Sequence, residues 1–265
     1  MATEKPLSLL HLEYENAAQA YLHMLRTEHP EHFMEATTQA YQRKITLESL
    51  DLVSARNPTV QVFNELLVQY PHGRTKRIRQ VVPDNMVAIH REPLRVVGSY
   101  NVPFQPVGPF WVMEYVSREN KRKDYEDSFA KYERELKVPY YLLFYPDNQE
   151  LTLFHHGGRK YRTVIANDRG RYALPELDLE VSLLDSWARY WYQGELLPLP
   201  ADLLRGLEEA RRELQQAQEQ TRQAQEQTRQ AQKQARQAQE QADQERQQKE
   251  RLLAQLRELG IEPKL

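Results

Sequence analysis

The sequence predicts an α/β or α+β domain with a mixed sheet, followed by a long C-terminal coiled-coil helix. Three observations lead to this prediction. Apolar residues recur at helical spacing near the N-terminus, short apolar runs follow from about residue 77, and a heptad repeat runs from Leu203 to Leu259. We expect the globular domain to cover residues 1–195, including a helical lead-in over about 1–45, with a linker at 196–200 and a coiled coil at 201–265.

The composition excludes several classes of site. The chain of 265 residues contains no cysteine, which rules out disulfides, thiolate metal sites and a cysteine nucleophile, and suits a reducing compartment. The first 25 residues have acidic side chains throughout and no uninterrupted apolar run, so they predict neither a signal peptide nor a membrane span. We therefore expect a cytoplasmic protein without a membrane partner.

Charge is nearly balanced in both parts of the chain. The net charge is −2, and residues 201–265 carry 12 basic and 12 acidic side chains, which leaves 24 basic and 26 acidic ones before them. Neither part is globally basic. Any binding to nucleic acid must therefore come from a local basic cluster.

The first predicted elements are two helices and four strands. Helical spacing predicts helices near residues 15–27 and 60–70, the latter with Val62, Leu66 and Gln69 or Tyr70 on successive turns. Short β-like runs separated by proline and glycine then predict strands at 77–82, 85–89, 94–97 and 110–116.

A further helix and a β-meander follow. Aromatic and apolar residues repeat at three and four from Tyr125 to Leu136 and predict a helix over 123–136, which ends at Val138-Pro139. Residues 140–165 contain three apolar runs joined by two turn sequences, which is typical of a β-meander. We expect a short helix at 184–194 to close the domain.

The tail has an unbroken alternation of four and three residues, which predicts a coiled coil about 85 Å long. Its seam consists of Leu203, Leu207, Ala210, Leu214, Ala217, Thr221, Ala224, Thr228, Ala231, Ala235, Ala238, Ala242, Glu245, Lys249, Leu252, Leu256 and Leu259. Alanine and threonine bury little area, so the leucines at both ends should supply most of the association free energy. We expect a homodimer, in which Glu245 and Lys249 set the register; the alternatives are another protein as partner and an isolated charged helix.

Pro83-Asp84 lies inside an otherwise strand-like run, VVPDNMVAI. Because proline is tolerated in sheets mainly at edges, first positions and bulges, the pair predicts either a strand interrupted around Asp84 or an ordinary surface turn. Thirty residues later, Glu114 lies in an apolar strand, where a carboxylate is costly unless it is paired. Two carboxylates on neighbouring strands suit a hard divalent cation, which can activate water and neutralise charge on a phosphodiester.

Other short motifs follow this pair in a characteristic order. They are Glu114–Ser117, Asp124 before a helix with Tyr132, Val138–Tyr141 and Leu174–Trp187. With these motifs, residues 40–192 resemble the Uma-type restriction-endonuclease family of the PD-(D/E)XK nuclease superfamily. The resemblance implies a restriction-endonuclease-like α/β domain with helices flanking a mixed sheet. It also implies Mg²⁺- or Mn²⁺-dependent hydrolysis of DNA phosphodiester bonds.

The same resemblance implies a set of site residues. Asp84 and Glu114 would bind the metal, with the backbone carbonyl of Tyr115 as third ligand, and their carboxylates should lie within about 4 to 6 Å of each other. The family's lysine corresponds to Ser128, which cannot offset charge in a transition state. Lys131 lies about one helical turn away and is the expected catalytic substitute. The other candidates for the lysine are Lys121 and Lys123.

Two basic clusters lie close in sequence to the acids. The residues expected to contact DNA phosphates are Arg74, Lys76, Arg77, Lys121 and Lys123. The alternative is that these runs are solvated loops. Glu65, in the predicted helix before the sheet, is a candidate for an additional acid near the metal.

Three classes of function fit these observations. The first is a metal-dependent DNA endonuclease that uses Asp84, Glu114 and Lys131. The second is a catalytically inactive nuclease-fold protein that binds DNA or acts as a scaffold through its coiled coil, because Ser128 has replaced the lysine. The third, a purely structural coiled-coil protein, leaves Asp84 and Glu114 unexplained.

Overall fold

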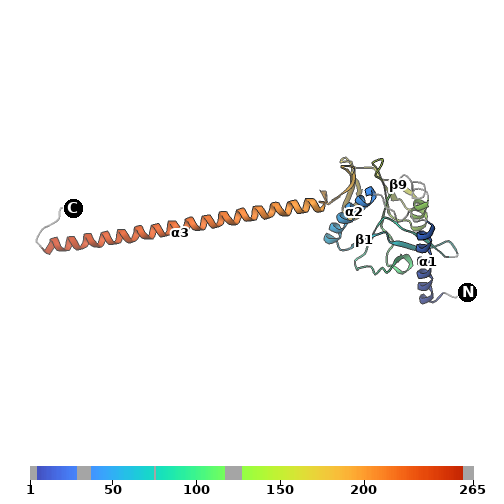
Figure 1. Cartoon of the computed structure of the whole chain (residues 1–265), viewed down its shortest axis with the longest axis horizontal. Coiled ribbons are helices and arrows are strands. Elements are labelled where there is room, and N and C mark those ends of the chain that lie inside the picture. Colours follow the sequence, from blue (N-terminus) through green and yellow to red (C-terminus); the bar gives the residue numbers. More distant parts are fainter. Residues whose placement is uncertain (1–4, 29–36, 75, 117–126, 259–265) are drawn as a thin grey trace. The chain divides into compact units, whose positions relative to one another are not determined.

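The computed structural model describes residues 5–28, 37–74, 76–116 and 127–258. The chain divides into two units, Met1–Pro200 and Ala201–Leu265. The first unit holds the sheets and the helices α1 (Leu7–Glu28) and α2 (Thr37–Arg56), and the second consists of most of α3 (Pro200–Glu258) (Figure 1). Among the residues described, no helix is long and apolar enough to span a bilayer.

A six-stranded mixed sheet is the largest sheet of the first unit. Its strand order is β1-β4-β6-β7-β8-β9; β6 and β7 are parallel, and the other neighbours are antiparallel. The strands are β1 (Val60–Asn64), β4 (Asn85–Ile89), β6 (Trp111–Tyr115), β7 (Tyr140–Tyr145), β8 (Glu150–His156) and β9 (Tyr161–Thr163). The predicted mixed sheet with flanking helices is confirmed, and β7, β8 and β9 form the predicted meander.

Two smaller sheets complete the unit. One is an antiparallel sheet of β10 (Tyr172–Leu174), β11 (Leu179–Leu184), β12 (Trp187–Tyr192) and β13 (Glu195–Leu196). In the other, β2 (Leu67–His72) pairs with antiparallel β3 (Arg77–Val81) and parallel β5 (Ser99–Asn101). Short 3₁₀ turns occur at Val102–Phe104 and Pro175–Leu177.

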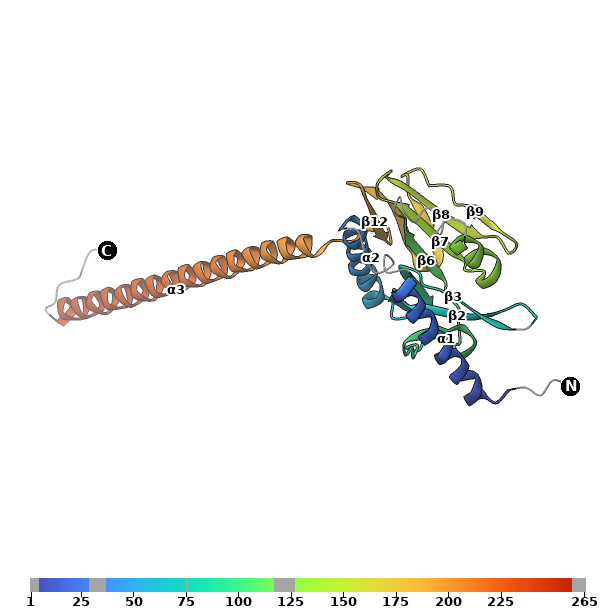
Figure 2. The same cartoon turned by 45° about the vertical axis from the view of Figure 1, so that its right-hand side comes forward.

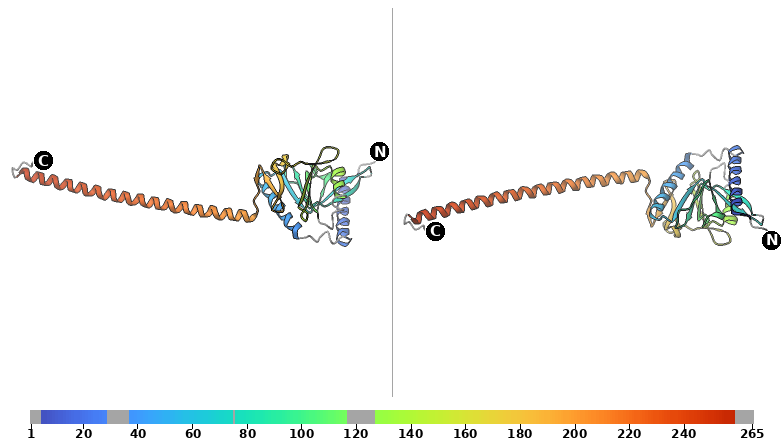
Figure 3. Two further views of the ribbon diagram at one scale, coloured as in Figure 1. Left: turned by 90° about the horizontal axis from the view of Figure 1, so that it is seen from above. Right: turned by 90° about the horizontal axis from the view of Figure 1, so that it is seen from below.

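Buried and half-buried glutamines attach the two helices to the sheets. Figures 1 and 3 show the strands of this unit between α2 and α1, and Figure 2 shows α2 beside β12. Gln69 on β2 and Gln80 on β3 donate hydrogen bonds to backbone carbonyls of α1. On the other side, Gln42 of α2 donates to the carbonyl of Ala188 on β12 and accepts from its N–H. These bonds satisfy amides that would be costly to bury unpaired.

Alternate residues of β6 enter two different cores, which explains why the strand is apolar almost throughout. Trp111, Met113 and Tyr115 join the cluster between the large sheet, α2 and the four-stranded sheet. Val112 joins a second cluster with side chains of β2, β3, β7 and the helix η4 (Lys131–Leu136). A strand covered on both faces has nearly continuous apolar character. Glu114 lies on this strand and is also buried.

The segment around Pro83-Asp84 connects two sheets. β3 of the three-stranded sheet ends at Val81, and β4 of the large sheet begins at Asn85. Proline lacks the N–H that would continue a ladder, so the pair interrupts the strand where the chain changes sheet. The interpretation as an interrupted strand is confirmed.

Three predicted elements are wrong. Residues 60–70 form β1 and the start of β2 instead of a helix, because Glu65, with a φ of 47°, makes a turn between them. Residues 184–194 form the β11–β12 hairpin and its continuation, since Asp185 and Ser186 both adopt positive φ in a tight turn. Residues 94–97 make only an isolated bridge from Val97 to Ser99, and the strand is β5.

The helix predicted at 123–136 is helical from residue 127 onward, and its final part is the π-helix η4. Lys137, in the left-handed conformation, ends it. A π-helix is rare and is frequent at functional sites. Residues 123–126 lie outside the described residues.

The predicted helical tail is confirmed as α3, a helix of 59 residues. The predicted linker, 196–200, runs from the last residue of β13 through buried Leu197 to Pro200, the first residue of α3. Whether the tail forms a coiled coil stays a prediction.

Candidate active site

Three acidic residues lie at the same level of the large sheet: Glu65 just after β1, Asp84 just before β4 and Glu114 near the end of β6. β1 pairs Asn64 with Asn85 of β4, and β4 pairs Asn85 with Met113 of β6. Continuing each register by one residue places Glu65 opposite Asp84, and Asp84 opposite Glu114. The N–H of Glu65 donates to the carbonyl of Asp84 at 3.1 Å, in agreement with this register.

The carboxylate of Asp84 is held by its neighbours on both sides. Its Oδ2 accepts a 2.6 Å hydrogen bond from the backbone N–H of Tyr115 on β6, and its Oδ1 lies 3.3 Å from Nη2 of Arg43 on α2. A quarter of the side chain is exposed to solvent. Asp84 is therefore oriented toward β6 and remains accessible.

Glu114 is almost fully buried and is paired by a tyrosine. The hydroxyl of Tyr132, on η4, donates a 2.6 Å hydrogen bond to Oε1 of Glu114. Burial raises the pKa of Tyr132 well above its usual value, and the negative charges of Glu114 and Asp84 raise it further. Glu114 shares a face of β6 with Val112, on the side that η4 covers, and the continued β4–β6 register places Asp84 opposite Glu114. The predicted separation of 4 to 6 Å between them stays a prediction.

Helix α2 contributes two polar side chains that the sequence did not indicate. Nε2 of Gln39 donates to the carbonyl oxygen of Tyr115 at 2.9 Å, and Arg43, one turn later, lies with Nη1 2.6 Å from Oε1 of Glu65. Glu65 is thus linked to Asp84 through Arg43. The nearest sequence signal was the polar i, i+4 spacing of Gln39 and Arg43, which gives no indication of contacts with strands far along the chain.

A buried hydroxyl network fixes Tyr115 from the opposite face. Its hydroxyl donates to Oδ1 of Asn85 at 2.7 Å and lies 2.6 Å from the hydroxyl of Thr46, which in turn lies 2.8 Å from the hydroxyl of Tyr190. Burial raises the pKa of Tyr115 well above its usual value, so the phenol stays neutral and keeps donating. The network anchors the residue whose N–H holds Asp84 and whose carbonyl accepts from Gln39.

The oxygen atoms at this place are of the type that a hard divalent cation requires. Asp84 and Glu114 offer carboxylates and Tyr115 a carbonyl, and each already has an orienting hydrogen-bond donor from the protein. Within the parts of the chain that the structure describes, no group of three His, Asp or Glu side chains could hold a metal ion. A metal here would therefore need the backbone carbonyl or water in addition to the two carboxylates.

The sequence of the chain matches a known protein family. The model of Uma2, described as a putative restriction endonuclease, matches residues 33–186, more than half of the chain. The chain belongs to the Uma2 family. Restriction-endonuclease-like families generally use divalent metal ions. No curated protein matches the chain.

Among solved structures, the Uma2 chain is similar to a putative nuclease belonging to DUF820 from Anabaena variabilis ATCC 29413. The sequence identity is 14%, the match covers 54% of this chain and 75% of the other, and the TM-score is 0.41.

The residues expected to replace the Uma2 lysine are only partly described. Ser128, which we expect at the family's lysine position, is buried, and Lys131 is half-buried at the start of η4. Lys121 and Lys123 lie outside the described residues. Participation of Lys131 in the site stays a prediction.

The basic residues of β2, β3 and the turn between them differ in their surroundings. Arg74, Lys76 and Arg77 are exposed on the β2–β3 hairpin. Arg79, on β3, instead lies 3.3 Å from Glu135 of η4, which also accepts a hydrogen bond from Tyr70. The three exposed residues are the described members available for phosphate contacts.

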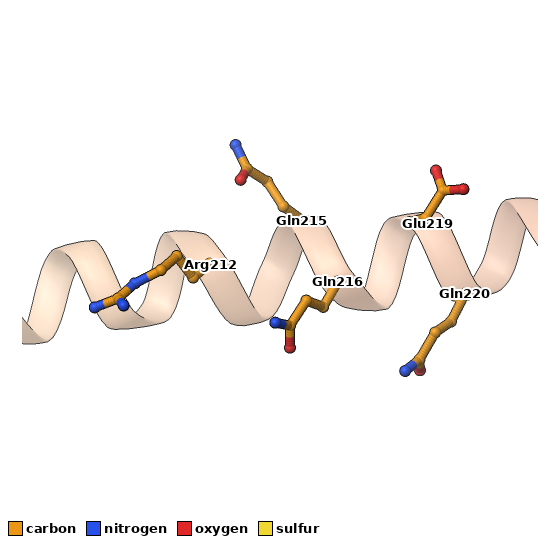
Figure 4. A pocket seen from close by; sticks show the side chains of 5 residues that line it. All are labelled: Arg212, Gln215, Gln216, Glu219 and Gln220. Atoms are coloured by element: carbon orange, nitrogen blue, oxygen red, sulfur yellow. The ribbon is translucent and has the colours of Figure 1, made fainter.

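An open groove on the surface of α3 is separate from these acids. Figure 4 shows its lining side chains, all on one helix: Arg212, Gln215, Gln216, Glu219 and Gln220. Gln215 and Glu219 point to one side of the helix, and Gln216 and Gln220 to the other. They form the solvated surface of a helix and offer no counterpart of the paired acids.

Proposed function

We propose that the chain is a Mg²⁺- or Mn²⁺-dependent DNA endonuclease, with a nuclease domain at 1–195 and a coiled coil at 201–265. The observation that carries the proposal is the hydrogen bond from the Tyr115 N–H to Asp84, next to Glu114, which accepts a hydrogen bond from Tyr132. This hydrogen bond holds Asp84 against β6, the strand that also carries Glu114 and the carbonyl of Tyr115. Membership of the Uma2 family supports the same activity.

The proposed chemistry assigns a task to each residue. Asp84, Glu114 and the carbonyl of Tyr115 would hold a cation that neutralises phosphate charge and makes a bound water more acidic. Tyr132 orients Glu114. Lys131 would orient the attacking water in place of the lysine that Ser128 replaces.

Basic residues outside the site would contact the DNA backbone. Arg74, Lys76 and Arg77 are exposed on the β2–β3 hairpin, and Lys121 and Lys123 complete the proposed set. Such contacts supply affinity without sequence information. As part of the proposal, the protein acts in the cytoplasm as a homodimer joined through α3.

Cleavage of supercoiled plasmid and of single-stranded DNA tests this function. The full chain and Asp84→Ala are incubated with Mg²⁺, Mn²⁺ or a chelator, and Asp51→Ala, an exposed acid on α2, serves as control. We expect cleavage by wild type and by the control with either ion, and none by Asp84→Ala or with chelator. Equal cleavage by wild type and Asp84→Ala would assign the activity to another site.

A second function is favoured by one observation: Ser128, which we expect at the family's lysine position, is buried. In this version the chain binds DNA or acts as a scaffold through its coiled coil, without turnover. The same experiment separates the two functions, because the inactive protein would shift DNA in a gel but cut none with either ion.

A further inference from the structure

The helix α3 has one face suited to burial and an opposite face suited to water. The exposed leucines of the seam are Leu203, Leu207, Leu214 and Leu252, each with about half or more of its surface open in the single chain. Ion pairs within the helix, such as Glu219 with Arg222 and Arg236 with Glu240, lie on the side away from the seam. A stripe of this length requires a partner helix.

The threonines of the seam are already prepared for burial. The hydroxyls of Thr221 and Thr228 donate to the carbonyls of Ala217 and Ala224, four residues earlier in the same helix. Their polar atoms therefore need no partner from another chain. In the central part of the seam, from Ala217 to Ala242, only methyl groups and alanine side chains remain to pack, and these allow two helices to approach closely.

The seam matches itself when it is reversed about the midpoint between Arg229 and Gln230. In an antiparallel pair the second helix runs in the opposite direction, so its seam intervals of four and three residues are met in reverse order. Each seam residue then faces the residue at the same distance on the other side of this midpoint. The matched residues are Leu207 with Leu252, Ala210 with Lys249, Leu214 with Glu245, Ala217 with Ala242, Thr221 with Ala238, Ala224 with Ala235 and Thr228 with Ala231.

Charge distinguishes this arrangement from a parallel one. In a parallel, in-register pair, Glu245 would face Glu245 of the second copy, and Lys249 would face Lys249, which places like charges together in the seam. Reversal instead places Lys249 opposite Ala210, whose small side chain leaves room for the lysine stem to reach water. Glu245 then faces Leu214 and no acid.

Two leucines beside the seam favour the same direction. Leu204 and Leu253 each follow a seam residue, and Leu204 is exposed. Reversal brings Leu204 of one helix next to Leu253 of the other. A parallel pair would place Leu253 beside Gln248, so its apolar surface would stay in water or against an amide.

We propose that α3 pairs with a second copy of itself in the antiparallel direction, with Leu207 facing Leu252. This inference rests on the proposed self-association and not on cleavage. Each chain enters α3 at Pro200, so the two entry points would lie about 88 Å apart for 59 residues at 1.5 Å each. The two nuclease domains would therefore act on separate DNA sites, and not on the two strands of one site.

Disulfide cross-linking of the full chain tests the direction, because the chain has no cysteine of its own. Ala217→Cys and Ala242→Cys chains, carrying tags of different mass, are oxidised separately and after mixing. We expect cross-linked dimers only in the mixture, since the two residues face each other across the pair. Thr221→Cys with Ala238→Cys is a second pair, and Gln223→Cys, away from the seam, is the control that should stay uncross-linked.

The other outcomes overturn the inference in distinguishable ways. Cross-linking of Ala217→Cys with itself would establish a parallel pair. A dimer in sedimentation without cross-links from either mixture would exclude the register. A wild-type chain that sediments as a monomer at tens of micromolar would exclude self-association. Cross-linking as expected from a chain that cuts no DNA would leave the inference standing and remove only the proposed nuclease activity.

Discussion

Arg43 bridges two acids at the end of the large sheet. Its Nη1 lies 2.6 Å from Glu65 and its Nη2 3.3 Å from Asp84, and only 14% of the side chain is exposed. Partly buried pairs are screened less by salt than surface pairs. The guanidinium therefore neutralises charge on the same carboxylate that the proposed cation would bind, and the two positive charges oppose each other.

Replacement of Arg43 by methionine should strengthen metal binding. A pair of this kind contributes about 1 kcal/mol, so we expect roughly fivefold tighter Mn²⁺ binding in calorimetric titration. Arg56→Met, on the exposed end of the same helix, is the matched control and should bind as wild type does. Unchanged or weaker affinity in Arg43→Met would mean that the guanidinium and the cation do not share Asp84.

The sequence predicts part of this site for a physical reason. Asp84 and Glu114 are carboxylates in strand-like apolar surroundings, where a charge needs a partner, so each was visible without a structure. Arg43 and Gln39 were not, because their contacts with Asp84 and Tyr115 depend on how α2 packs against the sheet. Such long-range contacts leave no periodic signal in the sequence.

At the scale of elements, the β11–β12 hairpin depends on an unfavourable backbone conformation. Asp185 and Ser186 have φ of 52° and 70°, which glycine adopts without steric cost. Ser186→Gly should therefore stabilise the fold by about 0.5–1 kcal/mol and raise its urea midpoint.

A second serine-to-glycine substitution in the same hairpin is the control for Ser186→Gly. Ser182→Gly lies inside β11 and should lower the midpoint, because glycine weakens a strand interior and the serine hydroxyl bonds to the carbonyl of Gly170. If Ser186→Gly also lowered the urea midpoint, the positive φ at Ser186 would not be a source of strain in the turn.

The β2–β3 hairpin should contribute to DNA affinity through charge. Replacing Arg74, Lys76 and Arg77 together by alanine should weaken binding in fluorescence anisotropy and flatten the plot of log affinity against log salt by up to about 2.7. The reason is that each lost phosphate contact releases about 0.9 fewer counterions.

Another exposed hairpin supplies a control of equal charge. Alanine at Arg159, Lys160 and Arg162, around the β8–β9 turn, removes the same three charges from a different surface. For this control variant we expect a smaller change in the slope of log affinity against log salt than for the β2–β3 variant. Equal slopes for both triple variants would indicate attraction by net charge alone and remove the hairpin from the interface.

Local signals explain which elements the sequence predicts. The β7–β9 meander follows from turn residues between apolar runs, and pairing between consecutive strands needs no further information. The aromatic run of β12 was expected to be helical, although aromatic residues favour strands, because its partner β11 was not recognised as a strand. The parallel pairing of β2 with β5 joins residues 32 positions apart, such as Leu67 and Ser99, and has no local signature.

At the scale of the whole molecule, the chain combines a Uma2 domain with a helix of 59 residues. The helix was predictable along almost its full length, because its period needs no tertiary contacts. If two copies pair as proposed, the nuclease domains are joined to opposite ends of the pair, about 88 Å or roughly 26 base pairs apart. Binding to two DNA sites would then be a property of the dimer and not of the domain.

The central claim is that Asp84 and Glu114 hold one divalent cation together. Calorimetric titration of Mn²⁺ into the full chain, Asp84→Asn, Glu114→Gln and the control Asp51→Asn tests it most directly, because both site variants keep the shape of the side chain. We expect one binding site per chain in wild type and control, and no measurable binding in either site variant. Wild-type affinity in both site variants would contradict the claim and place any metal elsewhere.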